Sequence, residues 1–480
     1  MPGQPIRRRA AAPALLATVL LGVGAASGPA AAADRTVAVR GEIKAIALAG
    51  QVLYVARQPP GRGLAVERLV PGRPPQTVLR VRHRQDDVTL AASAEAVAIG
   101  LHDAQPDTDT EGVEALFTPS RVLVGAPGGA LREVTACRRG TLAPSVAVDG
   151  TRVLWVDGGC AEPTSRPRGL GPVAVATGSV DPAVAVARAP LDRGALAFGL
   201  AASGAGTFVG VVRPSFFSGG DGEVRRVEGD RLGSAILEEQ GSSLRVAGAL
   251  DGGRAVVVRD DMSEDGSGAS CQVETLVLSP DVPGRGVLPV GGCVDGDQAP
   301  VEVAAAADRV AAIATERRRP GFHGDDAVVS LRGDGTDRRV LARGGQRAPI
   351  GIAAAAGLVA RWQPRCAGGQ EVVVSDVGPA TAPTRVVRLC RAEILSRTAR
   401  RSGRHITVRV RCRQGCVGVV TDVTRCGPGP RRLRRFAFGP GTHRLRVRPR
   451  SASLRRGRVL LQLRVENGRS QPRVVTFPRR

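Results

Sequence analysis

A pair of short apolar segments joined by a small turn recurs seven times between residues 46 and 362. The first copy reads IALAGQVLYVA and the last reads IAAAAGLVARW. Spacings of 45, 56, 55, 47, 55 and 48 residues separate the first apolar residues of the second segments, which are Val52, Val97, Val153, Phe208, Ala255, Val310 and Leu358. Further Val-rich segments lie between the copies, so each unit contains about four strands. The repeat therefore predicts an all-β chain that forms a β-propeller of about seven four-stranded blades.

The turn residues of these units resemble those of a known group of proteins. Asp149-Gly150-Thr151-Arg152 and Asp251-Gly252-Gly253-Arg254 join paired segments, and Gly333-Asp334-Gly335 marks an outer hairpin. They resemble the TolB-type and related WD-like propeller repeats of secreted bacterial proteins over residues 40 to 390. The resemblance implies the fold and leaves the ligand open, because propellers carry many functions. Helical periodicity is absent, which argues against an α/β enzyme body.

The N-terminus has the pattern of a secretory signal. Arg7, Arg8 and Arg9 precede an apolar run over residues 10–26, and three alanines precede Asp34. This order predicts a signal peptide over residues 1–33 that uses the general secretory route. Later apolar runs are shorter than the roughly 18 residues that a membrane span needs. We therefore expect a secreted protein, extracellular or associated with the cell envelope, without a transmembrane span.

The chain contains nine cysteines, and export favours disulfides over free thiols. Equivalent places in the fifth and seventh units, at the ends of the second and fourth strands, predict the pairs Cys271 with Cys293 and Cys366 with Cys390. Cys137 and Cys160 fall on the same face and are predicted to link the second unit to the third. The alternative is that these are buried thiols. For Cys412, Cys416 and Cys426 a disulfide is favoured over a zinc site with His405 or His443, because the spacing matches no zinc motif. An odd total leaves one cysteine unpaired or joined to another chain.

Polar loops that follow the second strands lie on one face of the predicted propeller, where ligands commonly bind. The candidate residues on this ligand face are His102, Asp103, Asp107, Asp109, Glu111, Asp221, Asp260, Asp261, Asp265, His323, Asp325 and Asp326. One interpretation is a calcium ion held by Asp107, Asp109 and Glu111 or by Asp260, Asp261 and Asp265. The other is ordinary turn chemistry in water. Neither loop has a recognised ligand spacing, so we expect no cofactor and no bound metal.

Catalytic motifs are absent from the sequence. It contains no Gly-x-Ser-x-Gly elbow, no His-Glu-x-x-His helix and no phosphate-binding Gly-x-x-x-x-Gly-Lys loop. His102 beside Asp103 and His323 beside Asp325 are the remaining acid–base candidates. Isolated histidines in loops are usually only solvated. We therefore predict no catalytic residue, and the sequence favours a protein that is not an enzyme while leaving an enzyme as the alternative.

The last ninety residues differ from the rest in charge. Residues 391–480 contain 25 arginines against three acids, which accounts for 22 of the 24 net positive charges of the chain. Within 404–412 and 443–450, apolar residues alternate with arginine or threonine, which indicates strands with one buried face. This pattern predicts a propeller over residues 34–392 followed by a small arginine-rich β-sandwich over residues 393–480. The pattern and a Cys-rich first hairpin resemble the immunoglobulin-like domains appended to secreted proteins of actinobacteria.

Alternating arginines on these strands form a comb of positive charge about 6–7 Å apart. The predicted polyanion-binding residues are Arg409, Arg411, Arg413, Arg444, Arg446 and Arg448. Such a comb suits an anionic envelope polymer or acidic polysaccharide. Intracellular nucleic acid is not expected as a partner, because few aromatic residues are present for base stacking. The alternative is a solvated face that only increases solubility.

Two functions are compatible with these features. The preferred one is an exported, non-enzymatic binding or scaffold protein whose propeller face binds a protein or small ligand. Its basic C-terminal domain retains the protein on anionic polymers of the cell envelope. The other is a propeller-based lyase or hydrolase that acts on an acidic extracellular substrate.

Overall fold

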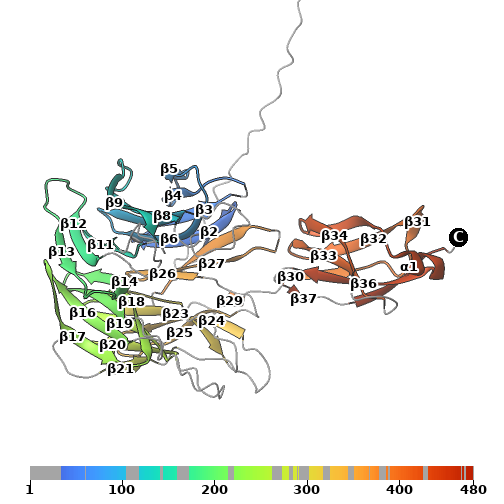
Figure 1. Cartoon of the computed structure of the whole chain (residues 1–480). Helices are drawn as coiled ribbons and strands as arrows, with labels where there is room; N and C mark the ends of the chain where they lie inside the picture. The colour runs from blue at the N-terminus through green and yellow to red at the C-terminus, as the bar shows by residue number, and fades with distance from the viewer. Residues whose placement is uncertain are drawn as a thin grey trace, which may run out of the picture.

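The computed structural model confirms the all-β prediction (Figure 1). It describes residues 34–59, 61–103, 118–140, 144–158, 172–213, 221–261, 273–279, 285–288, 290, 302–316, 325–343, 351–366, 368–377, 385–386, 390–424, 431–465, 468–469 and 472–478. This part of the chain contains 38 strands and one six-residue helix. None of its helices is long and apolar enough to cross a membrane.

Five blades of the propeller are separate four-stranded antiparallel sheets, and blades 5 and 6 lie in one nine-stranded sheet because a single parallel bridge, Gly248 to Ala305, joins their innermost strands. Counted as four-stranded units, the described residues form seven blades, the number that the repeat predicted. Blade 1 contains β2 (Glu42–Ala49), β3 (Val52–Gln58), β4 (Ala65–Leu69) and β5 (Gln76–Arg80). Blade 2 contains β6 (Gln85–Ala92), β7 (Val97–Asp103), β8 (Thr118–Gly125) and β9 (Arg132–Gly140). Blade 3 contains β10 (Val146–Asp149), β11 (Arg152–Gly158), β12 (Val173–Ser179) and β13 (Ala187–Pro190).

The remaining four blades repeat this pattern. Blade 4 contains β14 (Leu196–Ser203), β15 (Gly206–Arg213), β16 (Asp221–Glu228) and β17 (Arg231–Glu239). Blade 5 contains β18 (Ser242–Leu250), β19 (Arg254–Asp261), β20 (Val273–Leu278) and β21 (Arg285–Leu288). Blade 6 contains β22 (Val303–Ala306), β23 (Arg309–Glu316), β24 (Asp325–Arg332) and β25 (Arg339–Arg343). Blade 7 contains β26 (Gly351–Ala355), β27 (Leu358–Pro364), β28 (Gln370–Asp376) and β1 (Arg35–Val39).

The apolar repeat forms the interfaces between blades. Val97, Val153 and Phe208 are 0% exposed in the second strands of blades 2 to 4. Tyr54 of blade 1 packs in one cluster with Val97 of blade 2. Each apolar pair therefore fills the layer between adjacent blades, which explains why it recurs once per blade.

Ring closure uses the N-terminal strand, which the sequence did not reveal. β1 pairs with β28 in antiparallel register from Arg35 opposite Val374 to Val39 opposite Gln370. The fourth strand of blade 7 therefore comes from the start of the chain. The predicted equivalence of Cys390 to Cys293 implied that the segment ending at Cys390 is this fourth strand, and that implication is wrong. Within this segment, β29 (Arg385–Val386) pairs in parallel with β25.

The C-terminal unit consists of two sheets. One sheet contains β30 (Cys390–Ile394), β31 (Arg400–Ser402), β32 (His405–Cys412), β35 (Gly441–Val447) and β37 (Gly468–Arg469). The other contains β33 (Cys416–Asp422), β34 (Arg431–Phe438), β36 (Arg458–Val465) and β38 (Pro472–Thr476), and helix α1 (Ser451–Arg456) precedes β36. Buried residues of both sheets form a single hydrophobic cluster.

Two features of this unit differ from the sequence pattern. β30 begins at Cys390 and pairs with β32, so this strand spans the predicted domain boundary between residues 392 and 393. β32 and β33 lie in different sheets, so the Cys-rich segment between them is a corner and the expected hairpin is wrong. A Cys412–Cys416 disulfide joins the two sheets at this corner.

Another disulfide joins the propeller to the C-terminal unit. Cys366 in the turn between β27 and β28 is bonded to Cys390, which confirms the predicted pair. The place of this bond in the fold differs from the prediction, because Cys390 belongs to the core of the C-terminal unit and not to a blade. Cys137 is also disulfide-bonded. Cys160, Cys271, Cys293 and Cys426 lie outside the described residues.

Candidate functional site

The outer side of the sheet that contains β32 and β35 carries a surface that we call the arginine face, made of Arg409, Arg411, Arg444 and Arg446. Antiparallel pairing of the two strands places Arg409 directly opposite Arg444. Arg411 lies opposite Thr442, and Arg446 lies opposite Thr407. All four arginines are exposed, as are Arg413 and Arg448 just beyond the strands.

Apolar residues at the intervening positions hold these arginines outward. Val408 and Val410 of β32 are 0% exposed, and Leu445 and Val447 of β35 are 2% and 1% exposed. A register slip of one residue would bury the arginines and expose these apolar side chains, so the core fixes the arginine face in place.

Few acids offset the charge of this face. Glu393 of β30 lies 3.4 Å from the guanidinium of Arg411, as an exposed ion pair. Asp422 is 0% exposed and accepts hydrogen bonds from the backbone N–H of Thr424 and Arg450. Asp422 therefore stabilises the interior of the unit. Nη2 of Arg446 lies 3.4 Å from Nδ1 of His405. Because an imidazole nitrogen carries no negative charge, this contact does not neutralise the charge of Arg446.

The predicted ligand-face residues are spread over several blades. His102 and Asp103 end β7, Asp221 begins β16, Asp260 and Asp261 end β19, and Asp325 and Asp326 begin β24. Asp107, Asp109, Glu111, Asp265 and His323 lie outside the described residues. Within the part of the chain that is described, no three His, Cys, Asp or Glu side chains form a group that could hold a metal ion.

Several of these residues make contacts within the propeller. His102 is only 7% exposed. The side-chain amide of Gln85 donates to Oδ1 of Asp103 at 2.6 Å, which ties β7 to the start of β6. Oδ1 of Asp221 accepts from the backbone N–H of Gly241 at 3.4 Å. These contacts give the carboxylates a role in joining strands.

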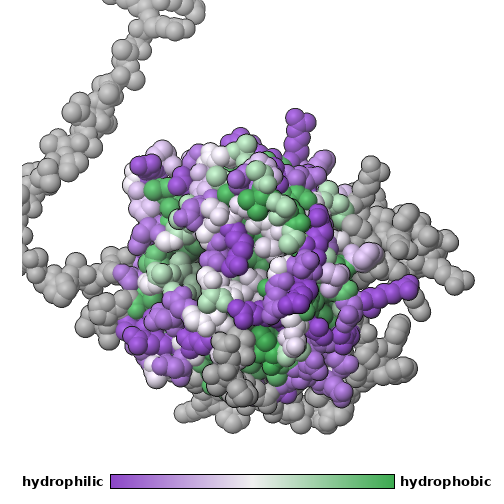
Figure 2. Space-filling model, turned by 90° about the vertical axis from the view of Figure 1, so that its left-hand side faces the viewer, coloured by the Kyte–Doolittle hydropathy of each residue, from purple (hydrophilic) through white to green (hydrophobic). Residues whose placement is uncertain are grey.

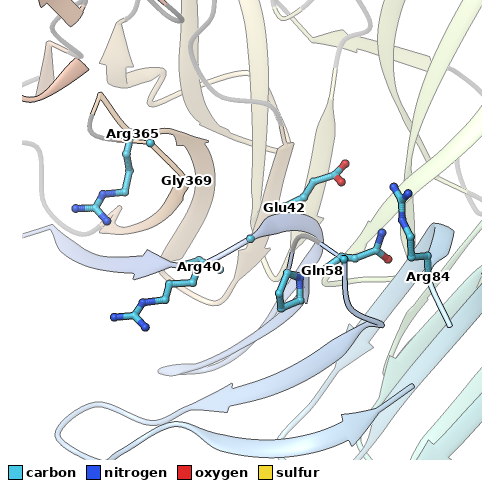
Figure 3. Close-up of a pocket in the computed structure, with 11 residues that line it drawn as sticks. Arg40, Glu42, Gln58, Arg84, Arg365 and Gly369 are labelled. Carbon is cyan, nitrogen blue, oxygen red and sulfur yellow. The ribbon is translucent and has the colours of Figure 1, made fainter. Parts of the chain in front are cut away.

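A second site lies where the propeller ring closes, and we call it the seam hollow (Figure 3). It has a volume of about 700 Å³. Its polar side chains are those of Arg40, Glu42, Gln58, Arg84 and Arg365. They come from the β1–β2 connection, the first residue of β2, the end of β3, the residue before β6 and the β27–β28 turn. The sequence carries no local signal for this site, because ring closure brings these segments together.

Contacts around the seam hollow fix its walls. Nη1 of Arg57 donates to the carbonyl oxygen of Arg40 at 3.2 Å. The hydrogen bond that Arg57 donates to Glu67 raises the pKa of Arg57 above its usual value, so the Arg57 side chain stays charged. Gln58 is 5% exposed, and its Oε1 accepts from the backbone N–H of Gln85 at 2.8 Å. The β1–β2 connection is therefore held by β3, and the end of β3 is held by the first residue of β6.

The described residues form no large hydrophobic patch on the side of the propeller away from the C-terminal unit. Figure 2 shows this side, where hydrophobic residues occur in separate patches among hydrophilic ones. Among the described residues, the exposed large hydrophobic side chains are Val184, Phe198, Val287 and Val474. Isolated exposed apolar residues are normal on protein surfaces.

No protein-family model and no curated protein matches the chain. A puromycin-hydrolysing peptidase of Mycobacterium tuberculosis is similar, with 15% identity, a TM-score of 0.46, and coverage of 78% of this chain and 59% of the peptidase. The β-propeller domain of the Trilobed protease from Pyrococcus furiosus has 10% identity and a TM-score of 0.45, with coverage of 72% of this chain and 100% of that domain. A polysaccharide lyase has 9% identity and a TM-score of 0.43, with coverage of 70% and 90%. The likeness concerns the fold alone, and this chain spans little more than half of the peptidase.

Proposed function

We propose that the chain is an exported, non-enzymatic β-propeller protein that binds anionic envelope polymers or acidic polysaccharide through the arginine face. In this proposal the propeller is of the TolB-like type and serves as a binding or scaffold unit for a protein or small ligand. The C-terminal unit is an immunoglobulin-like sandwich that retains the protein at the envelope. The disulfides support export, because such bonds persist in oxidising compartments.

The observation that carries this proposal is the cross-strand pair of Arg409 and Arg444. Like charges directly opposite each other destabilise a sheet, so folding alone gives no reason for the pair. Arg411 and Arg446 extend the charge in both directions along the strands, at a spacing of about 6.5–7 Å. A polymer with one negative charge per repeat unit can contact several of these guanidinium groups at once, each by paired hydrogen bonds.

The test replaces the four arginines of the arginine face with glutamine in the full chain, as R409Q, R411Q, R444Q and R446Q together. We expect weaker binding to immobilised polygalacturonate and to isolated cell envelopes. The dependence of log affinity on log salt concentration should also become shallower, because fewer counterions are released. Circular dichroism checks that the variant is folded.

The matched control removes the same charge from the other sheet. Arg432, Arg435, Arg458 and Arg464 are exposed on β34 and β36, and their replacement by glutamine should leave most of the binding intact. Equal loss in both variants would mean that net charge alone drives the association. In that case the arginine face would not be a specific site.

A further inference from the structure

The seam hollow carries positive charge that its neighbours do not neutralise. Among the described residues, Arg40 and Arg84 take part in no side-chain ion pair. Glu42 lies in the hollow, but its Oε1 is 3.0 Å from Nζ of Lys44. Arg365 has Glu371 at 3.9 Å, at the limit of an ion pair. Three guanidinium groups therefore lie in one hollow with little compensation.

The arrangement of these groups suits an anion. In Figure 3, Arg40 and Arg365 lie on one side of the hollow and project in the same direction, although they come from opposite sides of the seam. Arg84 lies on the other side, next to Gln58. Planar guanidinium groups bind carboxylate and phosphate oxygens by paired hydrogen bonds, which favours these two anionic groups over halide ions.

The walls of the hollow are fixed before any ligand binds. Gly41 adopts φ +106°, and a Cβ atom there would lie 2.7 Å from the carbonyl oxygen of Gln58. The β1–β2 connection therefore packs directly on the end of β3. The backbone N–H of Ile43 donates to Oε1 of Gln370, which joins blade 1 to blade 7 beside the hollow. A preformed site of this kind requires little ordering on binding, and this favours affinity.

We propose that the seam hollow binds a small ligand with carboxylate or phosphate groups, with one anionic group held between Arg40 and Arg365. Such a ligand contacts the connection that follows β1 and the turn that precedes β28. It therefore links the N-terminal strand β1 to the rest of blade 7 and stabilises the closed ring, because a ligand that binds only the folded state raises stability. The site lies on the propeller, so this inference does not depend on the proposed function of the arginine face.

Isothermal titration calorimetry on the full chain tests the site, with citrate and inorganic phosphate as separate probes at constant ionic strength. We expect saturable binding of at least one probe, and the two probes distinguish a carboxylate from a phosphate ligand. The R40Q/R365Q variant should bind about tenfold more weakly or worse, since charge-assisted hydrogen bonds are lost. The bound probe should also raise the Tm of the wild-type chain and have a smaller effect on the variant.

Three further variants make the result decisive. Arg73 and Arg80 are exposed on blade 1 outside the hollow, so R73Q/R80Q should bind as the wild type does. R40Q alone should weaken binding even if R40Q/R365Q fails to fold. The fourfold arginine-face variant should bind these probes normally. The inference is overturned if neither probe shows saturable binding, if R73Q/R80Q weakens binding as much as R40Q/R365Q, or if only the arginine-face variant loses it.

Discussion

Asp337 organises two arginines at the outer hairpin of blade 6. Its carboxylate pairs with Arg309, which is 8% exposed, and with Arg339 at 2.8 Å. Hydrogen bonding from Arg339 is the main cause that lowers the pKa of Asp337, and the charge of Arg309 adds to the effect. Asp337 also has φ +50°, a conformation that Asn tolerates well. Asp337→Asn therefore removes the charge without a large change in backbone preference.

We expect Asp337→Asn to lower the Tm of the propeller at pH 7, because it leaves the mostly buried charge of Arg309 without its carboxylate. A folded-state pKa below the unfolded value means that this stabilisation is complete above the unfolded pKa of Asp and is lost as the pH falls through the folded pKa. The difference in Tm between wild type and variant should shrink toward pH 3. A difference independent of pH would show that the ion pairs contribute nothing.

Gly41 gives a second test at the residue scale. Gly41→Ala places a Cβ atom at φ +106°, 2.7 Å from the carbonyl oxygen of Gln58 and 2.9 Å from Cα of Pro59. We expect a loss of about 1–2 kcal/mol from the backbone conformation, with an additional loss from the steric clash. Gly50→Ala is the matched control, because Gly50 has φ +54° and no neighbour within 4 Å of its Cβ position. Denaturant unfolding that gave equal losses for both would exclude the clash at the seam.

At the scale of elements, the Cys366–Cys390 bond connects a blade turn to the first strand of the C-terminal unit. It closes a loop with a sequence separation of 24, whereas Cys412–Cys416 closes one of 4. Loop-closure entropy grows with loop length, so C366A/C390A should lose about 3 kcal/mol of stability against denaturant. C412A/C416A should lose less.

Limited proteolysis gives an independent measure of the same bond. After cleavage between the propeller and the C-terminal unit, the wild-type fragments should stay together on a non-reducing gel. The fragments of C366A/C390A should separate. Wild-type fragments that separated without reductant would contradict the cross-link.

Strand number and strand faces could be predicted from the sequence, because both follow from local alternation and burial. The anchors Val97 and Val310 are 0% exposed at the expected places, and the arginine face follows from the period-two pattern around Val408. Strand partners could not be predicted. β1 pairs with β28 across more than 300 residues, and nothing in five residues specifies so distant a partner.

The cysteines show how a correct pairing can accompany a wrong placement. Cys366 and Cys390 have nearly the same spacing as Cys271 and Cys293, so equivalence of the repeats predicted the bond. The same equivalence assigned Cys390 to a blade, although it pairs with the C-terminal sheet. The seam hollow escaped prediction for a related reason, since its arginines converge only after ring closure.

At the scale of the whole molecule, charge is segregated between two separately packed units. Residues 391–480 hold 22 of the 24 net positive charges, and the propeller core is divided into clusters distinct from that of the C-terminal unit. Ionic strength should therefore act mainly on the C-terminal unit. The Debye length falls from about 30 Å at 0.01 M salt to about 3 Å at 1 M, which screens repulsion between neighbouring strands.

We expect 1 M sodium chloride to raise the Tm of the C-terminal transition more than that of the propeller transition in differential scanning calorimetry. R409Q should stabilise the C-terminal unit at low salt by roughly 0.2–1 kcal/mol, the range for cross-strand pairs, because it removes the repulsion with Arg444. The gain should vanish at 1 M salt. R464Q, which lies on the other sheet, serves as the control. If R409Q were destabilising at low salt, Arg409 would stabilise the fold, and the arginine face would no longer need a ligand to explain it.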